Sequence, residues 1–218
     1  MRINKYVAAA TGLSRRTADR LVDEGKVSVN GVVATAGQDI QQDDTVTMGS
    51  RTLQPPETQQ TIMLNKPVDY VVSRDGQGSR TVYDLLPPNL HHLKPIGRLD
   101  KNSSGLLLMT TNGQLAQELT HPKHQKTKVY EVTLGKPLTT QDKLHITQTG
   151  VLLGDGLSRF TLKPLDAQQF RWAVTMQEGR NRQIRRTFEK LGYRVITLHR
   201  THFGPYKLTP KSGDYTLL

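Results

Sequence analysis

The chain has 218 residues, no cysteine and a formal net charge of +11 at pH 7. The lack of cysteine excludes disulfides, thiol nucleophiles and thiolate metal ligands. No apolar run approaches the roughly 18 residues of a membrane span and no apolar leader is visible, which predicts a soluble, cytoplasmic protein without a membrane partner.

The positive charge is concentrated in the later part of the chain. Residues 1–60 hold seven Lys and Arg against seven Asp and Glu, whereas residues 61–218 hold 23 against 12. Such clustering favours a polyanionic partner, most simply a nucleic acid, because each neutralised phosphate releases counterions. A basic surface that merely keeps the protein soluble is the alternative.

Residues 1–50 predict a small domain of two helices and a small sheet. Ile3 and Val7 begin a helical pattern, Ser14 can cap a second helix, and Gly25 can end it. Asn30-Gly31 between two β-branched runs predicts a hairpin. The basic residues on or near the second helix are expected to contact RNA phosphates, with a solvated helix face as the alternative; they are Arg15, Arg16, Arg20 and Lys26.

The polar segment 51–60 contains a Pro-Pro pair, which predicts a linker to a second domain over residues 61–218. In that domain, runs typical of strands outnumber helices. Strands are expected at 61–67, 70–73, 105–111, 129–134 and 170–177, and helices before Pro122 and over 181–192. Without a regular alternation of strand and helix, the pattern indicates an α+β domain on a largely antiparallel mixed sheet with flanking helices.

Asp100 stands out in the stretch "GRLDKNSSGLLLMTT". Its loop is bracketed by Gly97 and Gly105 and leads into an apolar strand, so the strand can anchor a loop that presents the carboxylate. An aspartate is ionised at neutral pH, which suits a nucleophile or a charged base better than a proton donor. A turn or cap aspartate is the alternative.

Two further stretches carry candidate site residues. On the helix expected from "EGRNRQIRR", Arg185 flanks the apolar face and is best placed to reach inward, whereas Arg182 and Arg186 lie nearly opposite and suit phosphates. In "KVYEV", Tyr130 shares a strand face with Val132 and could stack on a base. Core packing of the tyrosine and a generic basic helix are the alternatives.

The motifs "GRLDKNSSGLLLMTTNG", "KVYEV" and "EGRNRQIRR", in this order, resemble the RsuA/RluB-type bacterial rRNA pseudouridine synthases. Residues 2–31 in front of them resemble the RNA-binding domain named after ribosomal protein S4. The resemblance implies isomerisation of one uridine in ribosomal RNA without cofactor or metal. It also implies roles for individual residues: catalysis by Asp100, base stacking by Tyr130, pairing of Arg185 with Asp100, an apolar contact from Leu198, and pocket or RNA contacts from Lys66 and Arg98.

Several alternatives stay open at this point. Thr187, His202 and Phe203 depart from the family pattern, which bears on target choice more than on chemistry. The pairs His121/His124 and His199/His202 could suggest a zinc hydrolase, although no cysteine or acidic partner stands at ligand spacing. A non-catalytic rRNA-binding assembly factor is a rival. Large-subunit rRNA is the expected target, with small-subunit rRNA as the alternative, and the protein is expected to be a monomer.

Overall fold

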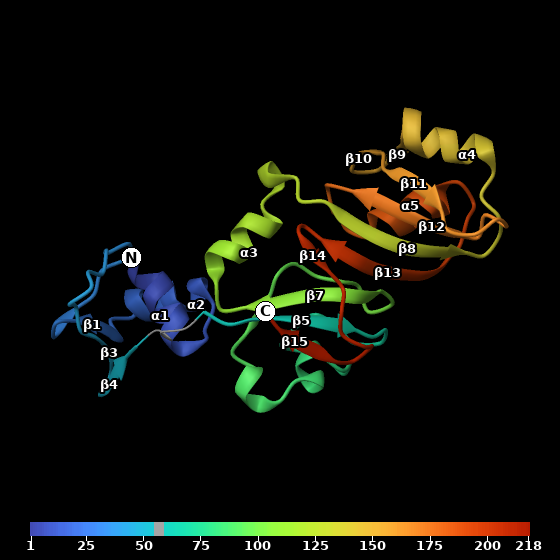
Figure 1. Cartoon of the computed structure of the whole chain (residues 1–218). Helices are drawn as coiled ribbons and strands as arrows, with labels where there is room; N and C mark the ends of the chain where they lie inside the picture. The colour runs from blue at the N-terminus through green and yellow to red at the C-terminus, as the bar shows by residue number, and fades with distance from the viewer. Residues whose placement is uncertain (55–58) are drawn as a thin grey trace. The chain divides into compact units, whose positions relative to one another are not determined.

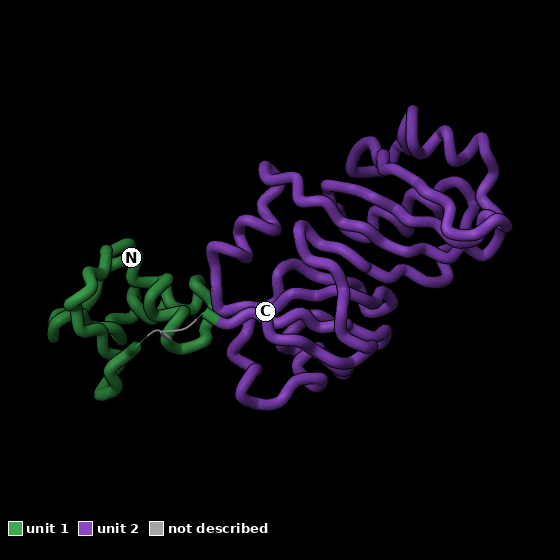
Figure 2. The backbone as a smooth tube through the Cα atoms, viewed as in Figure 1, with its two compact units in different colours: residues 1–59 green, residues 60–218 purple. Residues whose placement is uncertain are grey.

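The computed structural model describes residues 1–54 and 59–218. The chain divides into two compact units, residues 1–59 and 60–218, drawn in separate colours in Figure 2. Each unit has its own buried apolar core: one in unit 1, and two on the sheet of unit 2. Residues 55–58 of the expected linker lie outside the described residues.

Unit 1 packs two helices on a four-stranded antiparallel sheet of order β2-β1-β3-β4 (Figure 1). Ser14 caps the second helix, as expected, by accepting a hydrogen bond from the Thr17 amide at 3.0 Å. Asn30 and Gly31 take φ angles of 51° and 81°, which a tight hairpin turn requires. The elements are α1 (Ile3–Thr11), α2 (Arg15–Asp23), β1 (Val27–Val29), β2 (Val32–Val33), β3 (Val46–Met48) and β4 (Arg51–Leu53).

The start of the expected linker belongs to this sheet. Residues 51–53 form β4, which pairs with β3, and Leu53 is buried in the core of unit 1. The expectation of a linker beginning at residue 51 was therefore wrong. A single apolar residue in a polar run gave too weak a signal, although its burial is enough to hold a short edge strand.

Unit 2 is built on a nine-stranded sheet of order β11-β12-β8-β13-β7-β5-β15, with β14 beside β13 and β6 beside β7 (Figure 1). Among the described residues, β7 and β13 form the one parallel pair, so the sheet is largely antiparallel, as expected. Its strands are β5 (Thr61–Lys66), β6 (Lys94–Pro95), β7 (Ser104–Thr110), β8 (Lys128–Leu134), β11 (Thr161–Pro164), β12 (Arg171–Met176), β13 (Val195–Phe203), β14 (Tyr206–Lys207) and β15 (Tyr215–Leu217).

The remaining elements of unit 2 surround this sheet. Figure 1 shows α4 and the hairpin of β9 and β10 beside β11 and β12. The elements are α3 (Gly113–Thr120), α4 (Thr140–Leu144), β9 (Val151–Leu153), β10 (Gly156–Ser158) and α5 (Gln183–Lys190), with short helical turns at Val82–Leu85, Pro88–Leu90, Pro122–His124 and His145–Thr149. The expected helices before Pro122 and in 181–192 are confirmed, although α5 begins later because Arg182 has a φ angle of 48°.

The expected strand at 70–73 was wrong. Val71 makes only an isolated bridge with Thr81, bonding the neighbouring loop segment instead of the sheet. Tyr70 and Val72 pack against the main core of unit 2. The β-branched, apolar character of this stretch thus reflects burial under a loop, not membership of a strand ladder.

Gly105 marks the place where β7 pairs with β13, opposite Arg200. Its φ angle is 104°, and a Cβ atom added there would lie 2.3 Å from the carbonyl oxygen of Arg200. Only glycine allows two backbones to come this close. The pairing is reinforced by the Arg200 side chain, whose Nε donates to the Leu106 carbonyl at 2.8 Å. The loop before β7 is therefore fixed against β13.

Candidate active site

Asp100 lies on the loop before β7, as expected, and its side chain is 32% exposed. The amide of Ser103 donates to the Asp100 carbonyl at 3.0 Å, which closes a tight turn. The carboxylate thus has access to solvent, whereas its backbone is held by the strand that follows.

Arg182 is the cation that the structure places beside this carboxylate. Its Nη1 lies 3.7 Å from Asp100 Oδ2. The residue stands immediately before α5 in a left-handed conformation, with φ 48° and ψ 30°. Such a conformation is unfavourable for a residue with a side chain, and it occurs mostly where the surrounding structure requires it. Here it lets the guanidinium reach the Asp100 loop.

Arg185 points inward, as expected, but the expected ion pair with Asp100 was wrong. Its Nη2 donates to the Asn102 carbonyl at 2.6 Å and its Nη1 to the Val195 carbonyl at 3.1 Å. Burial, followed by the charge of Arg182, lowers the pKa of Arg185, and Asp100 opposes this shift. Arg185 therefore ties the Asp100 loop to β13, because carbonyl groups and not the carboxylate are its nearest acceptors.

Lys66, expected to contact the pocket or RNA, is fully buried at the end of β5. Its ammonium group donates to the carbonyls of Pro67 and Ser103, both at 2.7 Å, and lies 3.4 Å from the Lys101 carbonyl. Burial lowers the pKa of Lys66 to about 8, and the charge of Asp100 opposes this shift. The expected RNA contact was wrong; the lysine supports the Asp100 loop from inside.

Five of the expected residues line one cavity of about 230 Å³. Tyr130 from β8 and Leu198 from β13 are each more than nine-tenths buried, and Arg98 is exposed at the rim. Sequence reasoning missed the apolar wall from β12 and α5, whose residues have ordinary core patterns. The expected residues in the cavity are Arg98, Asp100, Tyr130, Arg182 and Leu198, and the wall residues are Met176 and Ile184.

Arg186, expected to contact phosphates, is engaged within the protein. Its Nη1 and Nη2 bond the two carboxylate oxygens of Asp155 at 3.1 and 2.7 Å. Arg180, which sequence reasoning did not single out, bonds the Asp155 and Leu157 carbonyls at 2.9 and 2.8 Å. Together the two arginines hold the β9–β10 hairpin to the end of unit 2 that carries the cavity. The only sequence signal for Arg180 was its place in the same basic motif.

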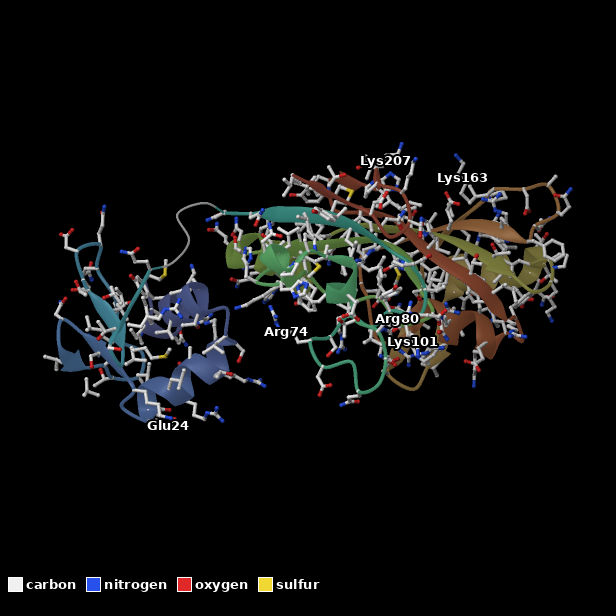
Figure 3. The ribbon with its side chains drawn as sticks, turned by 90° about the horizontal axis from the view of Figure 1, so that it is seen from below. Glu24, Arg74, Arg80, Lys101, Lys163 and Lys207 are labelled. Carbon is white, nitrogen blue, oxygen red and sulfur yellow. The ribbon has the colours of Figure 1, made fainter. Side chains whose placement is uncertain are left out.

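In unit 1, all four basic residues expected to contact RNA are exposed. Glu24, labelled in Figure 3, lies between two of them, 3.6 Å from Arg20 and 2.7 Å from Lys26. Arg15 bonds the side chain of Asn4 at 3.2 Å, whereas Arg16 extends into solvent. Their contact with RNA stays a prediction.

The histidine pairs do not form a metal centre among the described residues. His199 Nδ1 lies 2.8 Å from the Ser104 hydroxyl, and the rings of His121 and His124 meet edge to face at 5.9 Å. Within residues 1–54 and 59–218, no three His, Cys, Asp or Glu side chains gather as metal ligands would. In the same residues, no helix has the length and apolar character needed to cross a membrane.

Comparison with known families agrees with this arrangement. Residues 60–190 match the family described as RNA pseudouridylate synthase, and residues 1–46 match the S4 domain. Because the first match covers more than half of the chain, the chain belongs to the RNA pseudouridylate synthase family. It is an isomerase that acts on RNA.

Three relatives show the range of the family. The chain is 35% identical to the dual-specificity RNA pseudouridine synthase RluF of Escherichia coli K12, over 92% of this chain and 69% of that protein. It is 34% identical to the ribosomal large subunit pseudouridine synthase B of Pseudomonas aeruginosa, over 95% and 56%. It is 33% identical to the ribosomal small subunit pseudouridine synthase A of Pasteurella multocida, over 100% and 96%.

A solved structure supports the fold. The crystal structure of a pseudouridylate synthase aligns with a TM-score of 0.72 at 32% identity, and the alignment covers 100% of this chain and 96% of that one.

Proposed function

We propose that this chain converts one uridine of ribosomal RNA to pseudouridine in the cavity that holds Asp100. The observation that carries the proposal is the meeting in that cavity of one carboxylate, the arginine paired with it and one aromatic ring: Asp100, Arg182 and Tyr130. The reaction needs these groups, because a glycosidic bond must break, the uracil must turn, and its carbon-5 must bond to the sugar while the base stays in place.

Asp100 is the reacting group in this proposal. Its ionised carboxylate can attack the sugar carbon that carries the base, stabilise positive charge there, or remove a sugar proton. Arg182 holds the carboxylate in position from 3.7 Å. Tyr130 stacks on the uracil, and Leu198, Met176 and Ile184 give the detached ring an apolar enclosure. The nucleotide must be flipped out of any helix, because the enzyme cannot reach its atoms in the stack.

The expected target is large-subunit RNA, presented free or within an assembling subunit to a monomeric enzyme. The relatives support ribosomal RNA as a class, because two of the three names specify a ribosomal subunit. Their identities to this chain, 34% and 33%, do not separate large from small subunit. The expectation of the large subunit rests on the motifs of residues 14–31 and 179–186.

The test is incubation of unmodified ribosomal RNA with the wild-type protein and with Asp100→Asn, followed by chemical mapping of pseudouridine. We expect one new site in large-subunit RNA with the wild type and none with the variant. Asp69→Asn is a matched control, because it removes a nearby charge that does not line the cavity. A site only in small-subunit RNA would refute the target. Tight binding without any site, on free RNA and on immature subunits, would favour the assembly factor.

A further inference from the structure

A second, larger cavity of about 860 Å³ adjoins the Asp100 cavity. The two share Arg98, Tyr130, Gly179 and Arg180, so Tyr130 stands at their junction. An RNA strand that places one nucleotide against Asp100 must continue past this junction. The larger cavity is therefore in the right place for a neighbouring nucleotide. That the strand is RNA rests on the proposed function.

The floor of the larger cavity holds a buried arginine with unused hydrogen-bonding capacity. Arg200 lines the cavity, yet it is only 3% exposed. Its Nε donates to the Leu106 carbonyl, whereas its Nη2 is buried with no hydrogen-bond partner among the described residues. Buried donors are normally satisfied, and a buried guanidinium normally faces an acceptor or an anion. The described residues therefore leave one donor group of this side chain without an acceptor.

A second cation stands close by. Lys128 Nζ lies 5.5 Å from the centre of the Phe203 ring, and the Arg200 guanidinium carbon lies 4.7 Å from the same centre. Among the described residues, the hydrogen-bond acceptors of Lys128 are the carbonyls of Lys126 and Gln177, at 3.1 and 3.0 Å. Burial, followed by the charge of Arg200, lowers the pKa of Lys128, and Glu178 opposes this shift. The half-buried Lys128 and the buried Arg200 thus repel each other beside one cavity.

Glu178, the acidic residue of this cavity, does not neutralise Arg200 and Lys128. Glu178 is bound by Arg180 Nε at 3.4 Å and by the side-chain amide of Gln183. Among the ion pairs of the described residues, none includes Arg200 or Lys128. An anion seated between the two would relieve the repulsion and give the Arg200 guanidinium an acceptor.

We propose that Arg200 and Lys128 form a binding site for a backbone phosphate of the RNA strand, next to the target uridine. Phe203, one of the residues that depart from the family pattern, supports both cations through its ring. A phosphate fits this site better than a base does, because the site offers donors and positive charge, and because the cations already occupy the ring that a base could stack on. The site holds the strand while the target nucleotide turns toward Asp100.

The experiment measures binding, not turnover. Wild-type protein is titrated with the trinucleotide UpUpU and with an analogue whose two linkages are uncharged methylphosphonates, and the side-chain Nε–Hε NMR signal of Arg200 is followed. We expect the charged trinucleotide to shift this signal and to bind about tenfold more tightly than the neutral one, the effect of one charge-assisted hydrogen bond. In Lys128→Gln we expect the preference to fall to about twofold.

Lys163→Gln is the matched control. Lys163 is an exposed lysine of β11 that does not line the cavity, and Figure 3 shows it on the opposite edge of unit 2 from Lys101, the neighbour of Asp100. This variant should keep the tenfold preference. Melting curves of both variants test folding, and Arg200→Lys, which keeps the charge but loses the planar donor pair, gives an independent second variant.

The proposal is wrong if the wild type binds both trinucleotides equally, if UpUpU leaves the Arg200 signal in place, or if Lys128→Gln keeps the full preference. These outcomes are independent of the proposed function, because they report binding and the Arg200 signal, not the conversion of uridine. A protein that shows the phosphate preference but forms no pseudouridine on ribosomal RNA would refute the reaction and leave the phosphate site standing.

Discussion

Lys66 is a charged residue in a place where charges are rarely found. Its ammonium group is fully buried beneath the Asp100 loop, and its pKa is lowered to about 8 by burial. The folded protein therefore releases this proton at a lower pH than the unfolded chain does. Below pH 8 the buried charge costs stability, and the cost is relieved as the pH rises from 8 toward 10.5.

This sign gives a stability prediction for Lys66→Met. The free energy of unfolding of the wild type should gain about 2 to 3 kcal/mol relative to the variant between pH 7 and pH 10. Chemical denaturation at both pH values measures the difference. The exposed Lys163→Met is the control and should follow the wild type. A difference between wild type and Lys66→Met that is constant with pH would contradict a buried, charged lysine.

The two arginines near Asp100 should respond differently to substitution. Arg182→Gln removes the cation 3.7 Å from the carboxylate, and we expect turnover at saturating RNA to fall at least tenfold with little change in melting temperature. Arg185→Gln removes the hydrogen bonds from a buried guanidinium to the Asn102 carbonyl of the loop and the Val195 carbonyl of β13, and we expect a loss of about 1 to 3 kcal/mol of stability. Similar turnover losses in both, without the stability difference, would contradict these roles.

The sequence identified the side chains of this site more reliably than it identified their contacts. Helical spacing correctly placed Arg185 on the inward side of its helix, because that depends only on neighbours along the chain. Its acceptors come from Asn102 and Val195, which lie on other segments, and no local pattern could identify them. The prediction that Lys66 contacts RNA failed because lysine is usually exposed. Only the fold shows that three carbonyls surround its ammonium group.

At the scale of elements, Gly105 should be irreplaceable. Gly105→Ala puts a Cβ atom 2.3 Å from the Arg200 carbonyl oxygen at a positive φ angle, and we expect a loss of at least about 2 to 4 kcal/mol or failure to fold. Gly113→Ala is the matched control, because it lies at the start of α3 with no atom within 4 Å of the new Cβ. Equal stability of the two variants would contradict the close pairing of β7 and β13.

Long apolar or alternating strands were predictable from their own residues. β7 is buried along almost its whole length, and β8 alternates between buried and half-buried side chains, as their sequences indicate. Short strands such as β4, β6 and β15 were not predictable in this way, because each has two or three residues and depends on hydrogen bonds from a neighbour. The segment 70–73 shows the reverse error, where apolar residues packed under a loop without forming a strand.

At the scale of the whole molecule, the separate cores of the two units predict a division of labour. A fragment of residues 60–218 retains the complete Asp100 cavity and both cores of unit 2. We expect it to keep turnover at saturating RNA, with KM raised about tenfold or more through the loss of RNA contacts from unit 1. A thermal unfolding curve establishes that the fragment is folded. Complete loss of activity at saturating RNA would refute this division.

The arrangement of the catalytic cavity along the chain has a consequence for protein synthesis. Asp100 emerges from the ribosome early, but Arg182 and Leu198 follow some 80 to 100 residues later. The close pairing of β7 with β13 at Gly105, which fixes the loop, needs the backbone of Arg200. A nascent chain therefore carries the carboxylate without the groups that orient it until residues 182 to 200 have been made. The cavity can assemble only after the chain has been made through β13, which supplies Leu198, so a shorter growing chain lacks the complete site.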